Sequence, residues 1–358
     1  MCSSDLRCVI DHAPGVITSI DTGDISVAEI KRAIHRLKKG KSPGIDGISA
    51  ELLKCSKKDA VKQLHLLIND IWKKQCVPDW KKSLIVKVLK KGDLTQCGNY
   101  RGISVLSIPS KILCRVLIDR LKSGVDEMIR QEQAGFRSGR GTSEQIFALR
   151  NILEQYQEWQ APVYINFVDI SKAFDCIIRE GLWDIMEQYG IPDIFIRTFQ
   201  AIYHQNSSCV TEGGRYSSWF EVKSGVQQGC VLSGFIFVLI VDWVMWRTNV
   251  RRRGLRRKFT SVLEDLDYAD DVALISSRFT DLQEKTDRLA ATAGIVGFKI
   301  NPRKTKTLRM NHRCTEYIRI EGEDVEDVES FVYLGSVLDK LGGAEADIKR
   351  TAEHLEVR

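Results

Sequence analysis

Residues 266–276 have the sequence LDYADDVALIS. Apolar and β-favouring residues flank the core Tyr268-Ala269-Asp270-Asp271, so we predict a β-hairpin with two adjacent acids at its tip. Two carboxylates ~4 Å apart repel by roughly 4 kcal/mol at an effective dielectric of about 20, which cations would relieve. Oxygen ligands with no nearby Cys or His suit Mg²⁺ or Mn²⁺. An ordinary solvated acidic turn is the alternative that this stretch alone leaves open.

A third acid stands about a hundred residues earlier. The apolar segment 163–168 predicts a buried strand that ends directly at Asp169. That position presents a carboxylate at the edge of a sheet, although the same residue could cap a helix instead. One acid at a strand end and two on a hairpin fit a two-metal site, in which cations activate a 3′-hydroxyl and stabilise the departing pyrophosphate.

Composition and charge indicate a globular chain with a polyanionic partner. The 358 residues are 43% hydrophobic and 28% charged, which predicts two or three subdomains. The net charge of +6 is modest but clustered: residues 73–91 hold seven Lys against one Asp, and residues 251–258 hold six cations in eight. Basic stretches interleaved with Trp and apolar residues suggest nucleic acid, whereas two solvated faces are the alternative.

The ten cysteines include no Cys-x-x-Cys pair, so neither a zinc site nor a disulfide framework is indicated. The neighbours His312 and Cys314 are interpreted as structural. No apolar signal segment is seen, and the longest apolar run, 235–241, is far shorter than the ~20 residues of a membrane-spanning helix. We therefore expect an intracellular, reducing location without a membrane, with nucleus and cytoplasm not distinguished.

Periodicity and capping signals predict the order of the elements. Helices are expected over 26–39, 49–54, 59–75, 110–129, 143–159, from 179, and over 233–247 and 278–297. Strands are expected over 83–89, 163–168, both sides of the hairpin, within 298–310 and as a pair over 331–338. Residues 321–329 carry six acids in nine positions and are expected to form a solvated loop.

Eight ordered blocks carry a family resemblance: KSPGIDGISAELLK (41–54), NYRGISVLS (99–107), QAGFRSGRGT (133–142), FVDISKAFD (167–175), GVQQGCVLSG (225–234), YADD (268–271), GFKINPRKTK (297–306) and FVYLGS (331–336). With these blocks the chain resembles the reverse transcriptase domain of non-LTR (LINE-like) retrotransposons. The resemblance implies an α+β, right-hand polymerase fold. After a lead-in at 1–25, it implies fingers over 26–160 (family motifs from about 41), a palm over 161–338 with 190–225 inserted between catalytic blocks, and a truncated thumb starting at 339–358.

The resemblance also implies roles for single residues. The metal-binding catalytic acids are Asp169, Asp270 and Asp271. A second group of residues is expected to contact the incoming deoxynucleotide. These are Phe174 beneath the sugar, Gln228 and Gly229 on the nascent base pair, Arg101 on the triphosphate and Lys304 near the pyrophosphate. Those expected at template or primer are Arg137 and Arg140 on the template backbone, and Tyr333, Leu334 and Gly335 at the primer end.

The implied function is RNA-templated DNA synthesis dependent on Mg²⁺ (or Mn²⁺), with an RNA template, a DNA primer and deoxynucleoside triphosphates. A truncated, catalytically silent nucleic-acid-binding remnant is the alternative from another class. An RNA-templated RNA polymerase shares paired acids on a hairpin, but Phe174 and the eight blocks disfavour it.

The chain departs from the family at Gly234, where Pro is usual. Glycine at this position is expected to loosen the loop before the following helix. From the sequence, an endonuclease domain, a full thumb and a Cys/His knuckle are not expected in this chain.

Overall fold

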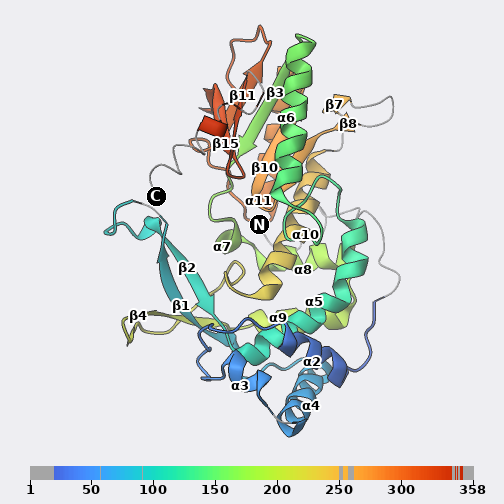
Figure 1. The fold of residues 1–358 in the computed structure, drawn as a ribbon, viewed down its shortest axis with the longest axis vertical. Helices are drawn as coiled ribbons and strands as arrows, with labels where there is room; N and C mark the ends of the chain where they lie inside the picture. The colour runs from blue at the N-terminus through green and yellow to red at the C-terminus, as the bar shows by residue number, and fades with distance from the viewer. Residues whose placement is uncertain are drawn as a thin grey trace. The chain divides into compact units, whose positions relative to one another are not determined.

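The computed structural model describes residues 20–56, 58–90, 92–249, 253–256 and 262–340, together with 343, 345 and 347–349 (Figure 1). The chain divides into two compact units, one formed by 1–128 and 177–237 and the other by 129–176 and 238–358. Helices and sheets occur in both, so the predicted α+β class is confirmed. These units do not follow the 160/161 boundary expected between fingers and palm, and that assignment stays a prediction.

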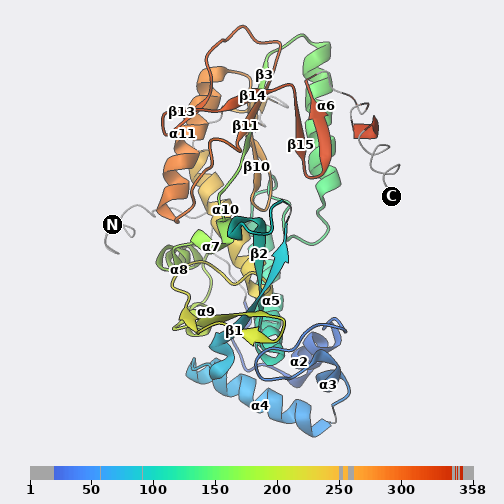
Figure 2. The same ribbon diagram turned by 90° about the vertical axis from the view of Figure 1, so that its left-hand side faces the viewer.

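The first unit begins with a cluster of helices. These are α2 (Val27–His35), α3 (Ala50–Lys54), α4 (Lys58–Lys74) and α5 (Ile108–Met128), with α8 (Arg179–Gln188) and α9 (Asp193–Tyr203) later in the chain. Ser26 caps α2 as predicted: its hydroxyl accepts from the Glu29 amide, and the Glu29 carboxylate accepts from the Ser26 amide at 2.8 Å. Figure 2 shows α2, α3 and α4 gathered together. The end of the lead-in is fixed to this cluster, because the buried Ile25 exchanges main-chain hydrogen bonds with the Asn69 side chain at 2.8 Å.

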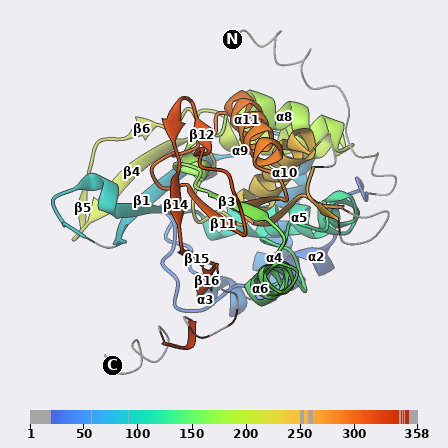
Figure 3. The same ribbon diagram turned by 90° about the horizontal axis from the view of Figure 1, so that it is seen from above.

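A five-stranded sheet completes the first unit. Its strands are β1 (Lys82–Leu89), β2 (Tyr100–Val105), β4 (Ser207–Glu212), β5 (Arg215–Tyr216) and β6 (Phe220–Glu221). β1 pairs antiparallel with β2 and parallel with β4, and β4 also pairs with β5 and β6. Figure 3 shows β4 between β1 on one side and β6 on the other. Short 3₁₀ turns at Asp79–Lys81 and Cys97–Asn99 lead into β1 and β2.

The second unit is built on a five-stranded sheet in the order β14-β11-β3-β10-β9. β3 (Val163–Val168) is central and fully buried, as its predominantly apolar and aromatic residues predict, and it pairs antiparallel with β10 (Asp271–Ser276) and β11 (Lys306–Met310). β9 (Asp265–Tyr268) and β10 form the predicted hairpin. The other elements are α6 (Thr142–Glu158), α7 (Ala173–Cys176), β7 (Leu255–Arg256), β8 (Val262–Leu263), α11 (Phe279–Ile295), β12 (Arg319–Ile320), β13 (Glu323–Asp324), β14 (Glu326–Val328), β15 (Ser330–Tyr333) and β16 (Ser336–Asp339).

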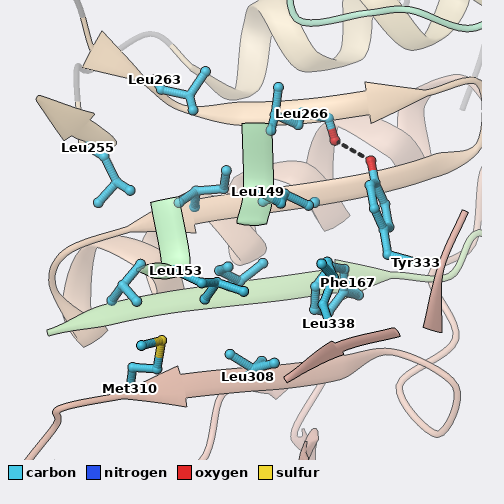
Figure 4. Close-up of a cluster of buried hydrophobic side chains, with 14 residues drawn as sticks. Leu149, Leu153, Phe167, Leu255, Leu263, Leu266, Leu308, Met310, Tyr333 and Leu338 are labelled. Atoms are coloured by element: carbon cyan, nitrogen blue, oxygen red, sulfur yellow. Dashed lines mark hydrogen bonds between the residues drawn. The ribbon is translucent and has the colours of Figure 1, made fainter. Parts of the chain in front are cut away.

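A hydrophobic core covers one face of this sheet (Figure 4). Alternate residues of β3, β10 and β11 point into it, and α6 contributes Leu149 and Leu153. The β15–β16 hairpin closes the same core: Phe331 stacks on Phe167 with ring centroids 4.3 Å apart. On the opposite face α11 packs on β3 and β10, and Asn166 donates a hydrogen bond to Thr286 at 3.1 Å. The sheet is therefore held on both faces.

The expectation of a solvated loop over 321–329 was wrong. β13 and β14 lie within it, and β14 pairs parallel with β11 as an edge strand of the main sheet. Cations on β11 explain why an acidic segment can pair here: Lys306 contacts Glu326 at 2.5 Å, and Arg309 forms an ion pair with Asp327. The segment keeps its acids near solvent and still contributes a strand.

Helix α10 (Val231–Thr248) runs through both units. It begins two residues earlier than expected, so Gly234 lies inside its first turn rather than in the preceding loop. By length and composition it is apolar enough to cross a membrane, but 72% of it is buried inside the structure, as in a core helix. Most of 339–358 lies outside the described residues, and the expectation of a truncated thumb is left as a prediction.

Candidate active site

Two of the predicted catalytic acids face each other across neighbouring strands. β3 and β10 pair with Val168 opposite Val272, and one further step of this register places Asp169 opposite Asp271. Directly opposed residues of an antiparallel pair point to the same face, with Cβ atoms about 4.5–5.5 Å apart. The strand pairing thus places two carboxylates side by side at the end of the buried sheet.

The third acid lies at the tip of the hairpin. Tyr268 pairs with Asp271, which leaves Ala269 and Asp270 as a two-residue turn. Ala269 takes the left-handed conformation with φ of +58°, as tight hairpin turns require of a central residue. Asp270 is consequently next to Asp271 and close to the end of β3, as the sequence predicted.

The three acids act on one another electrostatically. The pKa of Asp271 is raised from 3.8 to about 6, first because burial disfavours the charged form and then because of the charges of Asp270 and Asp169. Its outer side keeps contact with solvent. Burial and neighbouring negative charge both favour the protonated form of Asp271, so a cation beside it would stabilise the charged carboxylate.

The donor chemistry of this cluster fits a hard divalent cation, because every predicted ligand is a carboxylate oxygen. In the part of the chain that the structure describes, no three His, Cys, Asp or Glu side chains converge as closely as the ligands of one metal ion. The strands therefore supply three carboxylates that could hold such a cation.

Lys304 belongs to a turn that is attached to Asp169. The Asn301 amide donates to the Asp169 carbonyl at 2.9 Å, and the Asp169 amide donates to the Thr305 hydroxyl at 3.2 Å. The Lys304 side chain is exposed. The structure thus brings the residue expected near the pyrophosphate to the same end of β3 as the acids.

Phe174, expected beneath the sugar, is half-buried in the short helix α7. Its ring meets Phe136 edge to face, with centroids 6.3 Å apart and planes at 80°. Phe136 is 59% exposed and has φ of +56°, an uncommon conformation for an aromatic residue. No local pattern in the sequence marks Phe136, whose ring extends the aromatic surface of Phe174.

The predicted primer turn has a buried support. Tyr333 is 2% exposed, and its hydroxyl donates to the Leu266 carbonyl of β9 at 3.1 Å, as Figure 4 shows. Burial raises the pKa of Tyr333 well above its usual value, and the charges of Asp267 and Asp271 raise it further. Leu334 and Gly335 form the turn itself, both with positive φ. The side chain of Tyr333 therefore supports the catalytic hairpin, and the primer contact of the turn stays a prediction.

The two arginines expected at the template differ in their partners. Arg137 donates from one nitrogen to the carbonyl oxygens of Arg130 and Gln133, at 2.7 and 3.0 Å. Arg140 is partly exposed and donates to the Gln131 side chain. Arg137 therefore stabilises its own segment, and template contacts remain predictions for both residues.

Three further predicted residues lie in the first unit. Arg101 is exposed on β2. The loop that carries Gln228 and Gly229 attaches to the same strand, because the Ser104 amide donates to the Gln228 carbonyl at 2.6 Å. Gly229 has φ of +118°, and a Cβ there would lie 2.4 Å from the Ser104 carbonyl oxygen. Only glycine permits this approach, so strand and loop form one assembly.

A buried charge cluster beneath the hairpin was not predicted. Arg130 contacts Asp265 and Asp267 at 2.6 Å and Asp242 at 3.3 Å, and all three carboxylates are fully buried. Burial raises the pKa of Asp267 well above its ordinary value, Asp265 adds to this effect, and Arg130 opposes it. The one available signal was Asp242, a lone acid after the apolar run 235–241.

The basic stretches are partly engaged with acids. In 73–91, Lys73 pairs with Asp24 and Lys74 with Asp70, both at 2.7 Å. Such exposed pairs contribute about 0–1 kcal/mol, so phosphates could displace the acids. In 251–258, Arg253 is bound to acids of α11, while residues 251–252 and 257–258 lie outside the described residues.

Comparison with known families identifies the class of protein. Residues 88–338 match the reverse transcriptase (RNA-dependent DNA polymerase) family. The match covers more than half of the chain, from the end of β1 to β16, and includes all three acids. The chain belongs to this family.

The similar proteins narrow the class to mobile elements. The chain is 30% identical over 339 residues to a probable RNA-directed DNA polymerase from transposon BS of Drosophila melanogaster, covering 90% of this chain and 36% of that protein. It is 25% identical over 338 residues to the RNA-directed DNA polymerase from mobile element jockey of the same species, with the same coverage. A transposon TX1 protein of Xenopus laevis is 26% identical over 317 residues, covering 88% of this chain and 24% of that protein. The predicted resemblance to non-LTR reverse transcriptase domains is confirmed, and the chain spans about a quarter to a third of these relatives.

Proposed function

We propose that this chain catalyses RNA-templated DNA synthesis, adding deoxynucleotides from their triphosphates to a primer 3′-hydroxyl. The observation that supports the proposal is the register of β3 and β10, in which Val168 lies opposite Val272, so that the next step brings Asp169 towards Asp271 and the hairpin tip with Asp270. Family membership adds the reaction class. The RNA template, the DNA primer and the whole element's activity belong to this proposal.

In the proposed reaction, Asp169, Asp270 and Asp271 would hold Mg²⁺ or Mn²⁺. When bound, the cations activate the primer hydroxyl and neutralise the pyrophosphate. The exposed Lys304 lies on the turn attached to Asp169 and would bind the pyrophosphate leaving group. Phe174 would exclude a 2′-hydroxyl by contact. The roles of Arg101 on the triphosphate and of Gln228 and Gly229 on the base pair are carried over from the family.

The test is primer extension with purified protein, a poly(rA) template, an oligo(dT) primer, dTTP and Mg²⁺. We expect extension that EDTA abolishes and that is lost in Asp270→Asn. Extension with UTP in place of dTTP would favour an RNA-templated RNA polymerase. Binding of the primer–template without extension would favour the catalytically silent remnant.

The location that we propose is intracellular. All eight cysteines that the structure describes are free thiols, which suits a reducing compartment. A comparison of the protein's redox state in cell extracts, read by thiol labelling, would test this part of the proposal.

A further inference from the structure

Residues 130–135, here called the clamp segment, run along the outer side of β9. The Asp267 amide donates to the Glu132 carbonyl at 3.1 Å, and the Ala134 amide donates to the Asp267 carbonyl at 2.9 Å. Gln133 thereby forms a parallel bridge with Asp267, three residues before Asp270. The main chain of β9 is held by β10 on one side and by the clamp segment on the other.

The Gln133 side chain reaches from this segment to the tip of the hairpin. It is fully buried, and its Oε1 atom accepts two main-chain hydrogen bonds, from Ala269 at 2.9 Å and from Gly135 at 2.7 Å. Ala269 is the left-handed residue of the turn, directly before Asp270. One amide oxygen therefore fixes the orientation of the peptide that leads into the two acids.

Gly135 brings the clamp segment into direct contact with the tip. A Cβ at this position would lie 2.2 Å from the Ala269 nitrogen and 2.8 Å from its Cα. Backbone atoms cannot give way as the end of a flexible side chain can. The segment and the tip are therefore packed so closely that one cannot shift without the other.

Arg130 fixes the other end of the clamp segment. Its guanidinium binds Asp265 and Asp267 of β9, and its amide donates to the Asp242 carboxylate at 3.0 Å. A buried ion cluster of this kind resists displacement, because removal of one partner leaves buried charge unpaired. With Arg130 held below and Gly135 held at the tip, Gln133 has little freedom between them.

We propose that Gln133 is a positioning residue for the catalytic acids: its amide oxygen sets the hairpin tip so that Asp270 and Asp271 can join Asp169 around a divalent cation. A neutral amide suits this place, since a charged acceptor would add to the repulsion among the carboxylates. The inference rests on the proposed function for the purpose of the acids. The hydrogen bonds of Gln133 stand independently of it.

The experiment compares Gln133→Leu with Gln145→Leu. Gln145 is also a buried glutamine, and its amide donates to the Glu132 carbonyl of the clamp segment at 3.0 Å, but no hydrogen bond joins it to Ala269. Both variants lose a buried amide of the same size. Four quantities are measured: the thermal unfolding midpoint, Mn²⁺ affinity of the substrate-free protein by electron paramagnetic resonance, kcat, and KM for the primer–template.

For Gln133→Leu we expect kcat to fall at least about tenfold and at most about a hundredfold, since a misplacement of ~1 Å can cost about a hundredfold. Mn²⁺ affinity should fall with it, while KM for the primer–template stays level. Gln145→Leu should lower the unfolding midpoint by a similar amount, with kcat and Mn²⁺ affinity within about twofold of wild type. A purely structural role would lower only the unfolding midpoint in both variants, and that result would overturn the inference.

Gly135→Ala provides a second route if Gln133→Leu does not fold. It keeps the Gln133 side chain but pushes the tip away through the new Cβ, so kcat and Mn²⁺ affinity should again fall together. Folded Gly135→Ala with wild-type values for both would overturn the inference. If the wild-type protein binds Mn²⁺ but extends no primer, the proposed function fails, while Mn²⁺ affinity still decides the role of Gln133.

Discussion

Replacing Asp271 by Asn should make the metal-free protein more stable, although it removes a catalytic acid. The pKa of Asp271 in the folded protein is about 6 against an ordinary 3.8, so folding favours the protonated form. The carboxylate therefore lowers stability above pH 6, and this penalty disappears as the pH falls through 6 towards 4. At 1.36 kcal/mol per pH unit the difference corresponds to about 3 kcal/mol. Solvent on the outer side of Asp271 screens much of it, so we expect about 1 kcal/mol.

The assay is thermal unfolding in EDTA at pH 8 and pH 4.5, where 1 kcal/mol corresponds to about 2–4 °C for a body of this size. Asp271→Asn should unfold at a higher temperature than wild type at pH 8, and the gap should shrink at pH 4.5. Glu154→Gln, which removes one exposed carboxylate from α6 of the same unit, should show no such pattern. Saturating Mg²⁺ should reverse the order, since a ligand at 100 times its Kd stabilises wild type by about 2.7 kcal/mol. If Asp271→Asn were less stable than wild type in EDTA at pH 8, the reasoning from repulsion would be refuted.

Three further changes test other parts of the site. Asp270→Asn should reduce primer extension by orders of magnitude with the fold retained, which circular dichroism can check; near-normal extension would contradict the metal assignment. Phe174→Ala should admit UTP far better while dTTP incorporation falls less than in Asp270→Asn, and unchanged discrimination would make Phe174 an ordinary core aromatic. Gly229→Ala should raise KM for dTTP at least severalfold, because its Cβ would meet the Ser104 carbonyl oxygen at 2.4 Å. The control is Gly214→Ala, which also has positive φ but has open space, and an equal effect there would remove the steric argument.

Elements marked by an unbroken local pattern were predictable from the sequence. The bounds of β3 were predicted residue for residue, because every position from Val163 to Val168 except Asn166 is apolar or aromatic, and Asp169 ends the run. The hairpin and the N-cap Ser26 follow from equally local signals. These signals place Asp169, Asp270 and Asp271 on the correct elements, and the pairing of β3 with β10 then brings them together.

Features that depend on partners distant in sequence were not predictable. The acidic segment 321–329 looked like a loop because the cations that stabilise it as a strand lie on β11. The Arg130 cluster joins residues from 130 to 267, and each looks like an ordinary charged residue in its own neighbourhood. Gln133 belongs to the block QAGFRSGRGT, but no sequence pattern around it indicates that its side chain accepts a hydrogen bond from Ala269. Tertiary pairing, rather than propensity, determines these places.

The position of β9 at the end of the main sheet has a consequence for the behaviour of the protein in solution. An outermost strand exposes a row of amides and carbonyls that can recruit a strand from another molecule, which leads to aggregation. Here residues 132–134 occupy that row with the hydrogen bonds to Asp267. Variants that loosen this segment should therefore self-associate in addition to extending primers more slowly. Light scattering at rising protein concentration would detect the self-association.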